Sequence, residues 1–257
     1  MCLIVFAWDV HPKYKLVMAA NRDEFYNRPT AKAAFWEDHP EIFGGRDLKA
    51  GGTWMAASTL GKFAAVTNYR DLANIQDDAR SRGELPTGFL QHEGTPVDYV
   101  KQVHPNAEAY NGFNLLAADF HHMVHYSNYE RKINELAPGI YGLSNALLDT
   151  PWPKVTKARG MFEEVLATDF SHEDLLSMMG DTAIAADQVL PDTGLSKDME
   201  KALSAMCIRT PNYGTCCSTV LTMDRDGTVA LTEKSYPVGD RIEDLVRLEI
   251  KVDVVVQ

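Results

Sequence analysis

Segments with a strand-like pattern lie at both ends of the chain, and segments with a helical pattern lie between them. Towards the amino terminus, strands are expected at residues 3–8, 15–20, 54–58 and 62–67, with short turns joining them in pairs. Near the carboxyl terminus, strands at 219–223 and 228–232 flank an Asp-Arg-Asp-Gly turn, and Leu248, Ile250, Val252 and Val254 alternate with charged residues. This order predicts an α/β (α+β) fold in which two sheets are sandwiched by helices.

The middle of the chain supplies the helices and a further pair of strands. Thr95-Pro96 has the pattern of a helix start, and that helix is expected to run to about Val103. Apolar residues recur at helical spacing over residues 151–167, and Ser171 is expected to cap another helix. Residues 113–119 and 123–127 are expected to form paired strands. Because no linker or repeat divides the 257 residues, we expect one domain over residues 1–257.

The charge and hydropathy of the chain exclude several classes of partner. The formal net charge is −11, which would repel nucleic acid and an anionic membrane surface. The apolar runs are too short to span a bilayer, and the first eight residues lack the basic region of a signal peptide. We therefore expect no nucleic-acid partner, no integral membrane segment, and a cytoplasmic protein unless an unrecognised signal directs it to an organelle.

The cysteine and histidine spacings do not indicate a metal site. Four cysteines in a chain of this size do not form a disulfide framework, and neither C-x-x-C nor H-E-x-x-H is present. The adjacent Cys216 and Cys217 are interpreted as small apolar residues in a strand. His121, His122 and His125 cluster in the sequence and could suggest haem ligation, but we interpret them as ordinary surface residues.

Cys2 is the strongest candidate for a functional side chain because of its position. Methionine is normally removed when the next residue is small, which would leave a thiol and a free α-amino group on one residue. The α-amino pKa is close to 8, so this group can serve as the base that activates the thiol. The alternative is a structural cysteine buried at the beginning of an edge strand.

Polar residues follow the second predicted strand and could complete such a site. Asn21-Arg22-Asp23-Glu24 supplies a carboxylate that could orient an amine and a guanidinium that could hold an anionic group. If the first two strands form a hairpin, this segment returns towards Cys2. Asn68 and Asn145 stand at predicted strand ends, where an amide could donate to a developing oxyanion. The segment could equally be a solvated turn, and each asparagine a turn cap.

Several blocks of sequence together resemble one known family. They are Met1-Cys2 with Asn21-Arg22-Asp23-Glu24, Gly51-Gly52-Thr53-Trp54, Thr67-Asn68-Tyr69, Ser81-Arg82-Gly83-Glu84-Leu85, Tyr110-Asn111-Gly112-Phe113-Asn114-Leu115, the stretch from Tyr141 to Trp152, and Pro211-Asn212-Tyr213-Gly214-Thr215. This pattern, which runs from Met1 to about Ser235, is similar to that of the eukaryotic branch of the transport and Golgi organization 2 family. That family resembles N-terminal-nucleophile hydrolases of the penicillin V acylase and bile-salt hydrolase type.

The resemblance implies a four-layer αββα sandwich and a set of site residues. Cys2 would be the nucleophile, Asp23 would hold the amine, and Asn68 and Asn145 would help form the oxyanion site. Arg22, Glu24, Trp54, Tyr69 and Arg209 are expected to contact the ligand, and no metal ligands are expected.

The chain departs from the family pattern at two places. Arg22 directly precedes the aspartate, whereas the hydrolases usually place their arginine three residues before it. Relatives often carry arginine after Tyr-Gly-Thr, where this chain has Cys216, so an anion contact there would be missing, although Arg209 is near in sequence.

Three functions remain open from the sequence. The resemblance implies a protein that handles a small amphipathic ligand, with family roles in haem trafficking and in lipid or acyl-coenzyme A homeostasis. It requires no cofactor, although haem could be a transported ligand, and the family implies cytoplasmic, mitochondrial or Golgi-associated locations. The alternative is a Cys2-dependent amidase or thioesterase. A purely structural partner protein would explain the candidate site residues least well, and the fold alone does not decide among the three.

Overall fold

The computed structural model describes residues 2–239 and 241–253. Within these residues the strands form two antiparallel sheets that stack face to face. The first sheet has the order β10-β1-β2-β11-β12-β13. Its strands are β1 (Cys2–Trp8), β2 (Tyr14–Phe25), β10 (Gly139–Leu143), β11 (Tyr213–Asp224), β12 (Thr228–Ser235) and β13 (Asp244–Lys251).

The second sheet contains all the strands between β2 and β10, in sequence order from β3 to β9. They are β3 (Thr30–Phe35), β4 (Ile42–Asp47), β5 (Met55–Ser58), β6 (Phe63–Asn68), β7 (Phe113–Ala118), β8 (Met123–Ser127) and β9 (Ile133–Glu135). Because each strand pairs with the next along the chain, this sheet is a simple antiparallel meander.

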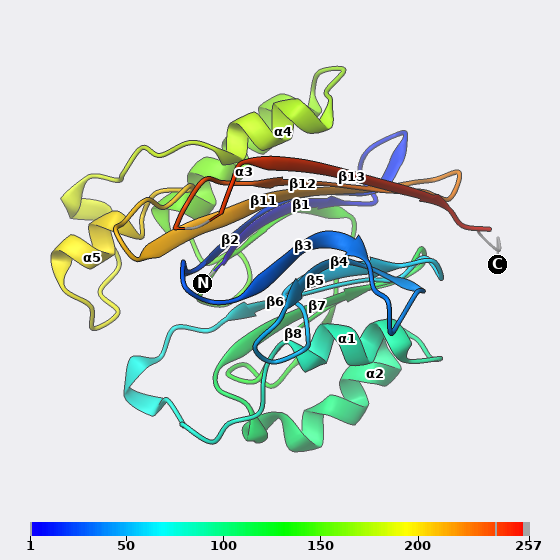
Figure 1. The fold of residues 1–257 in the computed structure, drawn as a ribbon, viewed down its shortest axis with the longest axis horizontal. Helices are drawn as coiled ribbons and strands as arrows, with labels where there is room; N and C mark the ends of the chain where they lie inside the picture. Colours follow the sequence, from blue (N-terminus) through cyan, green and yellow to red (C-terminus); the bar gives the residue numbers. More distant parts are fainter. Residues whose placement is uncertain (1, 240, 254–257) are drawn as a thin grey trace.

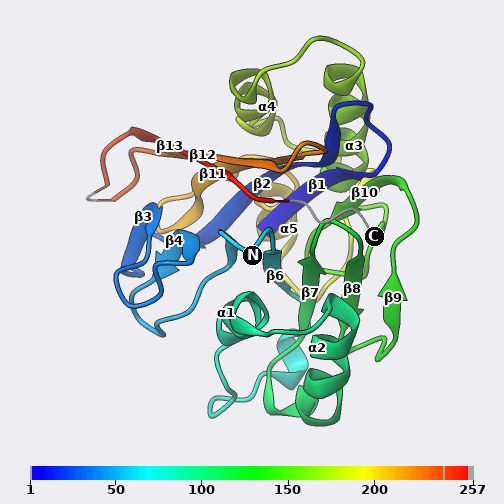
Figure 2. The same ribbon diagram turned by 90° about the vertical axis from the view of Figure 1, so that its right-hand side faces the viewer.

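Helices cover the outer face of each sheet (Figures 1 and 2). The pair α1 (Glu84–Gln91) and α2 (Pro96–Val103) packs on the second sheet, and α3 (Pro153–Leu166) and α4 (His172–Met179) pack on the first. The short α5 (Lys197–Ala202) lies at the same end of the sandwich as residues 68–83 (Figure 1). Short 3-10 helices occupy Leu72–Asn74, His104–Ala109 and Asp187–Val189.

Three apolar cores hold these layers together. The largest fills the space between the sheets, where Phe6, Met18 and Phe63 are fully buried. A second lies between the second sheet and α1 and α2, and a third lies between the first sheet and α3 and α4. The layer order is therefore helix, sheet, sheet, helix, which confirms the expected αββα sandwich.

Several local predictions are confirmed by the elements observed. Thr95 caps α2 in a capping box with Asp98, and Ser171 caps α4 in the same way with Asp174. The alternating pattern near the carboxyl end forms β13, although Val254, which was predicted to continue it, lies outside the described residues. Cys216 and Cys217 lie buried in β11, as expected.

Candidate functional site

The Asn-Arg-Asp-Glu segment lies inside β2 and does not follow it. The strand runs to Phe25, so the prediction that it ends near Ala20 is wrong, as is the solvated-turn alternative. β11 pairs with β2 over residues 14–25, which keeps this polar stretch extended. Because strand side chains alternate, Asn21 and Asp23 point towards the helix layer, like Ala19. Arg22 and Glu24 point towards the second sheet.

Asn21 is part of a buried hydrogen-bond network and does not line the cavities described below. Only 1% of the residue is exposed, and its amide nitrogen donates to the backbone oxygens of Met179 and Met206, each at 2.8 Å. Its side-chain oxygen accepts a hydrogen bond from Ser218. Asn21 therefore fastens β2 to the end of α4 and to the segment that leads into β11.

Cys2 begins β1, directly opposite Arg22 on β2. β1 lies between β10 and β2, so the edge-strand alternative is wrong. Ser144 donates a hydrogen bond to the Cys2 backbone oxygen at 2.9 Å, which fixes the start of the strand. Burial raises the pKa of the Cys2 thiol, and the negative field of Asp23 adds to this shift, while the charge of Arg22 opposes it. The thiol is therefore held predominantly neutral near pH 7.

Arg22 is held between an acid and an aromatic ring. It is 5% exposed, its Nη2 atom lies 3.7 Å from Glu24 Oε2, and its guanidinium lies 4.3 Å from the ring centre of Trp54. This is the acid pairing expected for a buried guanidinium. Its Nη1 atom has no hydrogen-bond partner within the described residues. Gly45 makes room for the indole, since a Cβ there would lie 2.1 Å from Trp54 Cη2.

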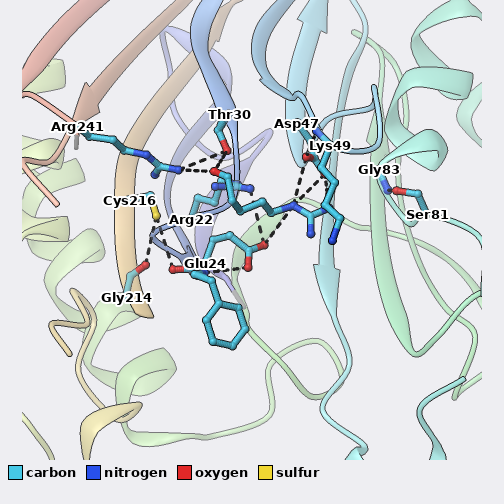
Figure 3. A network of polar contacts seen from close by, with 12 residues as sticks. Arg22, Glu24, Thr30, Asp47, Lys49, Ser81, Gly83, Gly214, Cys216 and Arg241 are labelled. Carbon is cyan, nitrogen blue, oxygen red and sulfur yellow. Dashed lines mark hydrogen bonds and ion pairs between the residues drawn. The ribbon is translucent and has the colours of Figure 1, made fainter. Parts of the chain in front are cut away.

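Glu24 joins Arg22 to Arg28. Figure 3 shows Arg22, Glu24 and Asp47 within this network of polar contacts. Arg28 forms an ion pair with Asp47 at 2.6 Å and lies 3.8 Å from Glu24. The Arg28 hydrogen bond helps hold the pKa of Asp47 below its usual range despite partial burial. The carboxylates and guanidiniums thus alternate along one wall of the site.

Asp23 lies in the helix-side layer with a buried lysine that the sequence analysis missed. Thr215 donates a hydrogen bond to Asp23 Oδ1 at 2.7 Å. Burial raises the pKa of Asp23, and the charge of Lys154 is the strongest opposing effect. Lys154, in the first turn of α3, is 2% exposed, and its Nζ atom has no hydrogen-bond partner within the described residues. Burial lowers its pKa, and Asp23 opposes that shift. In the sequence, Lys154 falls at helical spacing with Ala158 and Phe162, and this pattern could have predicted that the lysine is buried.

The two asparagines come together but differ in what they face. Asn68, at the end of β6, lines both of the cavities described below. Asn145 is buried behind it and donates from its side chain to the Asn68 backbone oxygen at 2.9 Å. Among the described residues, Asn145 is not part of the lining of either cavity.

Two adjoining cavities open beside these residues. The first, here the Cys2 cavity, has a volume of about 450 Å³. Its lining is largely polar and includes Cys2, Asp23, Trp54, Asp47, Asp77, Arg22, Arg28, Lys49, Arg80 and Arg82.

The second, here the apolar cavity, has a volume of about 350 Å³. Its lining includes Phe25, Tyr69, Leu72, Ile75, Leu195, Met199, Leu203 and Tyr213. The two cavities share Glu24, Asn68, Arg82 and Asn111.

The remaining predicted contacts divide between these cavities and the rest of the surface. Trp54 lines the Cys2 cavity, and Tyr69 lines the apolar cavity with its ring stacked on Tyr129 at 3.9 Å between centres. Arg209 is placed elsewhere, which corrects the expectation that it contacts the same ligand. Its exposed side chain lies 4.2 Å over the Tyr236 ring and donates to the Thr215 backbone oxygen.

The histidine cluster also requires a correction. His121 is exposed and His122 is partly exposed, but His125 in β8 is fully buried, so its interpretation as a surface residue is wrong. Its ring lies 3.3 Å from the Asn114 side-chain oxygen, and burial lowers its pKa to about 4. Within residues 2–239 and 241–253, no cluster of three or more histidine, cysteine or acidic side chains could hold a metal ion.

The described residues form a four-layer αββα sandwich, with Cys2 at the start of an inner strand and Asp23 on the neighbouring strand. The sequence profile of the family described as Transport and Golgi organisation 2 matches residues 1–237. The chain belongs to this family.

Its relatives include Transport and Golgi organization proteins from several animals. The Bos taurus and Homo sapiens homologs are each 39% identical, over 91% of this chain and 93% of the relative. The Drosophila melanogaster protein is 28% identical over 65% of each chain.

Two solved structures show distant similarity. A Caenorhabditis elegans ortholog of N-acylethanolamine-hydrolyzing acid amidase is 9% identical, with a TM-score of 0.48 over 86% of this chain and 92% of the other. A C2A mutant of the conjugated bile acid hydrolase from Clostridium perfringens is 11% identical, with a TM-score of 0.46 over 98% and 92%. The layer order seen in this chain itself defines the fold.

The helices in the described part of the chain are all too short or too polar to cross a membrane.

Proposed function

We propose that this protein binds an amphipathic ligand whose apolar part occupies the apolar cavity and whose polar, anionic part occupies the Cys2 cavity. The observation that carries the proposal is the junction of the two cavities at Glu24, Asn68, Arg82 and Asn111. One cavity is lined mainly by leucine, isoleucine, methionine and aromatic side chains, whereas the other presents four arginines and a lysine together with four acidic side chains. A ligand with one apolar part and one anionic part can therefore make favourable contacts in both cavities.

Family-level roles suggest a long-chain acyl-coenzyme A or haem as the ligand, and the protein would carry or buffer it in lipid or haem homeostasis. Both molecules join a large apolar portion to anionic groups. The exposed side chains of Phe25, Leu72 and Ile75 at the apolar cavity support this division, because such residues gain from being covered. Cytoplasmic, mitochondrial and Golgi-associated locations all remain proposals.

Two pairs of variants test the placement of the ligand. Ile75→Glu puts a charge into the apolar cavity, and Ile184→Glu makes the same change at an equally exposed isoleucine outside both cavities. Arg82→Ala removes a cation shared by the cavities, and Arg209→Ala removes one outside them. Titration with acyl-coenzyme A and with haem should show affinity lost roughly tenfold or more in the first member of each pair and unchanged in the second. Equal losses of affinity in both members of each pair would contradict the proposal.

A second candidate function is a Cys2-dependent amidase or thioesterase, favoured by the presence of the Cys2 thiol in the polar cavity beside Asp23 and Asn68. The thiolate would attack the carbonyl carbon, expel an amine or thiol, and leave a thioester that water hydrolyses. This requires removal of Met1, which lies outside the described residues, because only then would Cys2 carry its own amine as a base. Intact-mass measurement of native protein shows whether Met1 is absent.

Cys2→Ala separates the carrier from the enzyme. The substitution deletes the nucleophile but little apolar surface, so a carrier keeps its ligand affinity and its ability to rescue a null mutant. An enzyme loses turnover of amide or thioester substrates by several orders of magnitude. Full rescue by the alanine variant would reject the hydrolase, and retained binding with failed rescue would reject the carrier.

A further inference from the structure

Tyr213 lines the apolar cavity and has a buried hydroxyl. The residue begins β11, opposite Phe25 on β2, and the two rings meet edge to face with centres 5.2 Å apart. The hydroxyl has no hydrogen-bond partner within the described residues, although the side chain lines the cavity. A buried donor without an acceptor costs free energy, so a bound group that accepts from it would be stabilised.

The electrostatic surroundings of Tyr213 favour a neutral acceptor over an anion. Burial raises the pKa of its phenol well above the ordinary value, and the negative fields of Asp23 and Glu24 act in the same direction. Arg70 opposes them. The hydroxyl is therefore a permanent donor that lies in the negative fields of Asp23 and Glu24. A carboxylate placed beside it would be repelled by these acids, whereas a carbonyl oxygen would not.

The position of Asn145 leaves a role for another donor. Its side-chain nitrogen donates one hydrogen bond to the Asn68 backbone oxygen, and within the described part of the chain Asn145 is in the lining of neither cavity. Asn68 and Tyr213 both line the apolar cavity, and Asn68 also lines the Cys2 cavity. In an acyl compound, the carbonyl is the atom group that joins the apolar chain to the polar head. Seated across the two cavities, it would lie near Asn68, which lines both, with Tyr213 on the side of the apolar cavity.

We propose that the Tyr213 hydroxyl donates a hydrogen bond to the carbonyl oxygen of an acyl ester, amide or thioester, and so selects acyl conjugates over free carboxylates. This inference rests on the proposed amphipathic-ligand function and narrows its ligand class. It also gives the site a donor suited to a carbonyl oxygen that gains negative charge, should Cys2 react with it.

The test compares two ligands that differ in the carbonyl alone. Palmitoyl-coenzyme A carries a thioester, and S-hexadecyl-coenzyme A has a methylene in place of the carbonyl. We expect the unmodified protein to bind the thioester roughly 5- to 20-fold more tightly than the thioether, and Tyr213→Phe to bind them within about twofold of each other. Mass spectrometry after each titration shows whether the thioester is intact.

A stability measurement separates a binding role from a structural one. Tyr99 is the matched control, because its buried hydroxyl donates to the Leu85 backbone oxygen at 2.8 Å. Without ligand, Tyr213→Phe should leave Tm unchanged or raise it, whereas Tyr99→Phe should lower it, since only the second change abandons a buried acceptor. A fall in Tm for Tyr213→Phe as large as that for Tyr99→Phe would overturn the inference.

The outcomes distinguish this inference from the function on which it rests. If the unmodified protein and Tyr213→Phe show the same ratio of thioester to thioether affinity, the role of Tyr213 is rejected while ligand binding stands. If the unmodified protein binds neither compound, the amphipathic-ligand function and the Tyr213 inference both fail. Tighter binding of palmitate than of palmitoyl-coenzyme A would also overturn the proposed selection.

Discussion

Replacing Asn21 by alanine should destabilise the protein more than most single substitutions. The change deletes a side chain that donates to the backbone oxygens of Met179 and Met206, and it removes an acceptor for the Ser218 hydroxyl. All of these groups are buried, so water cannot readily replace the lost bonds. Each buried group left without a partner costs about 1–3 kcal/mol. After partial relaxation, the total loss in the free energy of unfolding should be about 3–5 kcal/mol.

The assay is urea unfolding followed by circular dichroism, with Asn74→Ala as a matched control. Asn74 is exposed, and its amide donates to Asp71 at 2.7 Å on the surface. Its replacement should change the free energy of unfolding by no more than about 0.5 kcal/mol. Asn21→Asp should be at least as destabilising as Asn21→Ala, because it keeps an oxygen but loses both donors. A loss below about 1 kcal/mol for Asn21→Ala would refute the idea that this network fastens β2 to the helix layer.

Three further predictions follow from the buried titratable groups and the ion pairs. His125 has a pKa of about 4 in the folded protein, below the ordinary value of 6.5, so protons favour the unfolded state and stability falls as pH drops from about 6.5 to 4. His125→Gln should remove about 2 kcal/mol of the stability difference between pH 7 and pH 5, measured by urea unfolding at both values. Burial raises the pKa of Cys2, so in the chain that retains Met1 its alkylation by iodoacetamide should be slow at pH 7 and should accelerate up to and beyond pH 9. Peptide mass spectrometry measures the rate, and fast alkylation at pH 7 would contradict this prediction. Arg28→Ala should lower the free energy of unfolding by about 1–3 kcal/mol at pH 7, and Asp47→Asn in the same background should cost little more, because the two side chains act as one pair.

The layer order could be predicted from the sequence, but only partly from local patterns. An apolar run identified β1, a hairpin turn identified β6, and hydrophobic alternation identified β13. The capping residues Thr95 and Ser171 located the starts of α2 and α4. β3, β4, β9 and β10 were not predicted. β4 contains two glycines, and β10 reads Gly-Ile-Tyr-Gly-Leu, so neither shows a clear alternation. Pairing with neighbouring strands, and not local propensity, makes these segments strands.

The candidate site was only partly readable for a related reason. Cys2, Arg22, Asp23, Glu24 and Asn68 are brought together as the family resemblance implied. The roles of Lys154 and Tyr213 depend on distant partners that no local motif records. The helical spacing places Lys154 on the apolar stripe of α3, but its neighbour Asp23 is known only once α3 packs on the first sheet. Tyr213 gains its unpaired hydroxyl only when β11 is placed beside β2. Arg209 was misplaced because nearness in sequence to Cys216 does not indicate the direction of a side chain.

Strand alternation explains why four consecutive polar residues can be buried without disrupting the fold. Asn21 and Asp23 face the helix layer, where Asn21 contacts backbone oxygens and Asp23 contacts Thr215. Arg22 and Glu24 face the second sheet, where they contact Trp54 and Arg28. The four side chains therefore divide between structural and site roles according to the face they occupy, and a one-residue shift in the pairing of β2 would exchange those faces. The long pairing of β2 with β11 and the Asn21 network make such a shift costly, so the residues that fix the register of β2 also position Arg22 opposite Cys2.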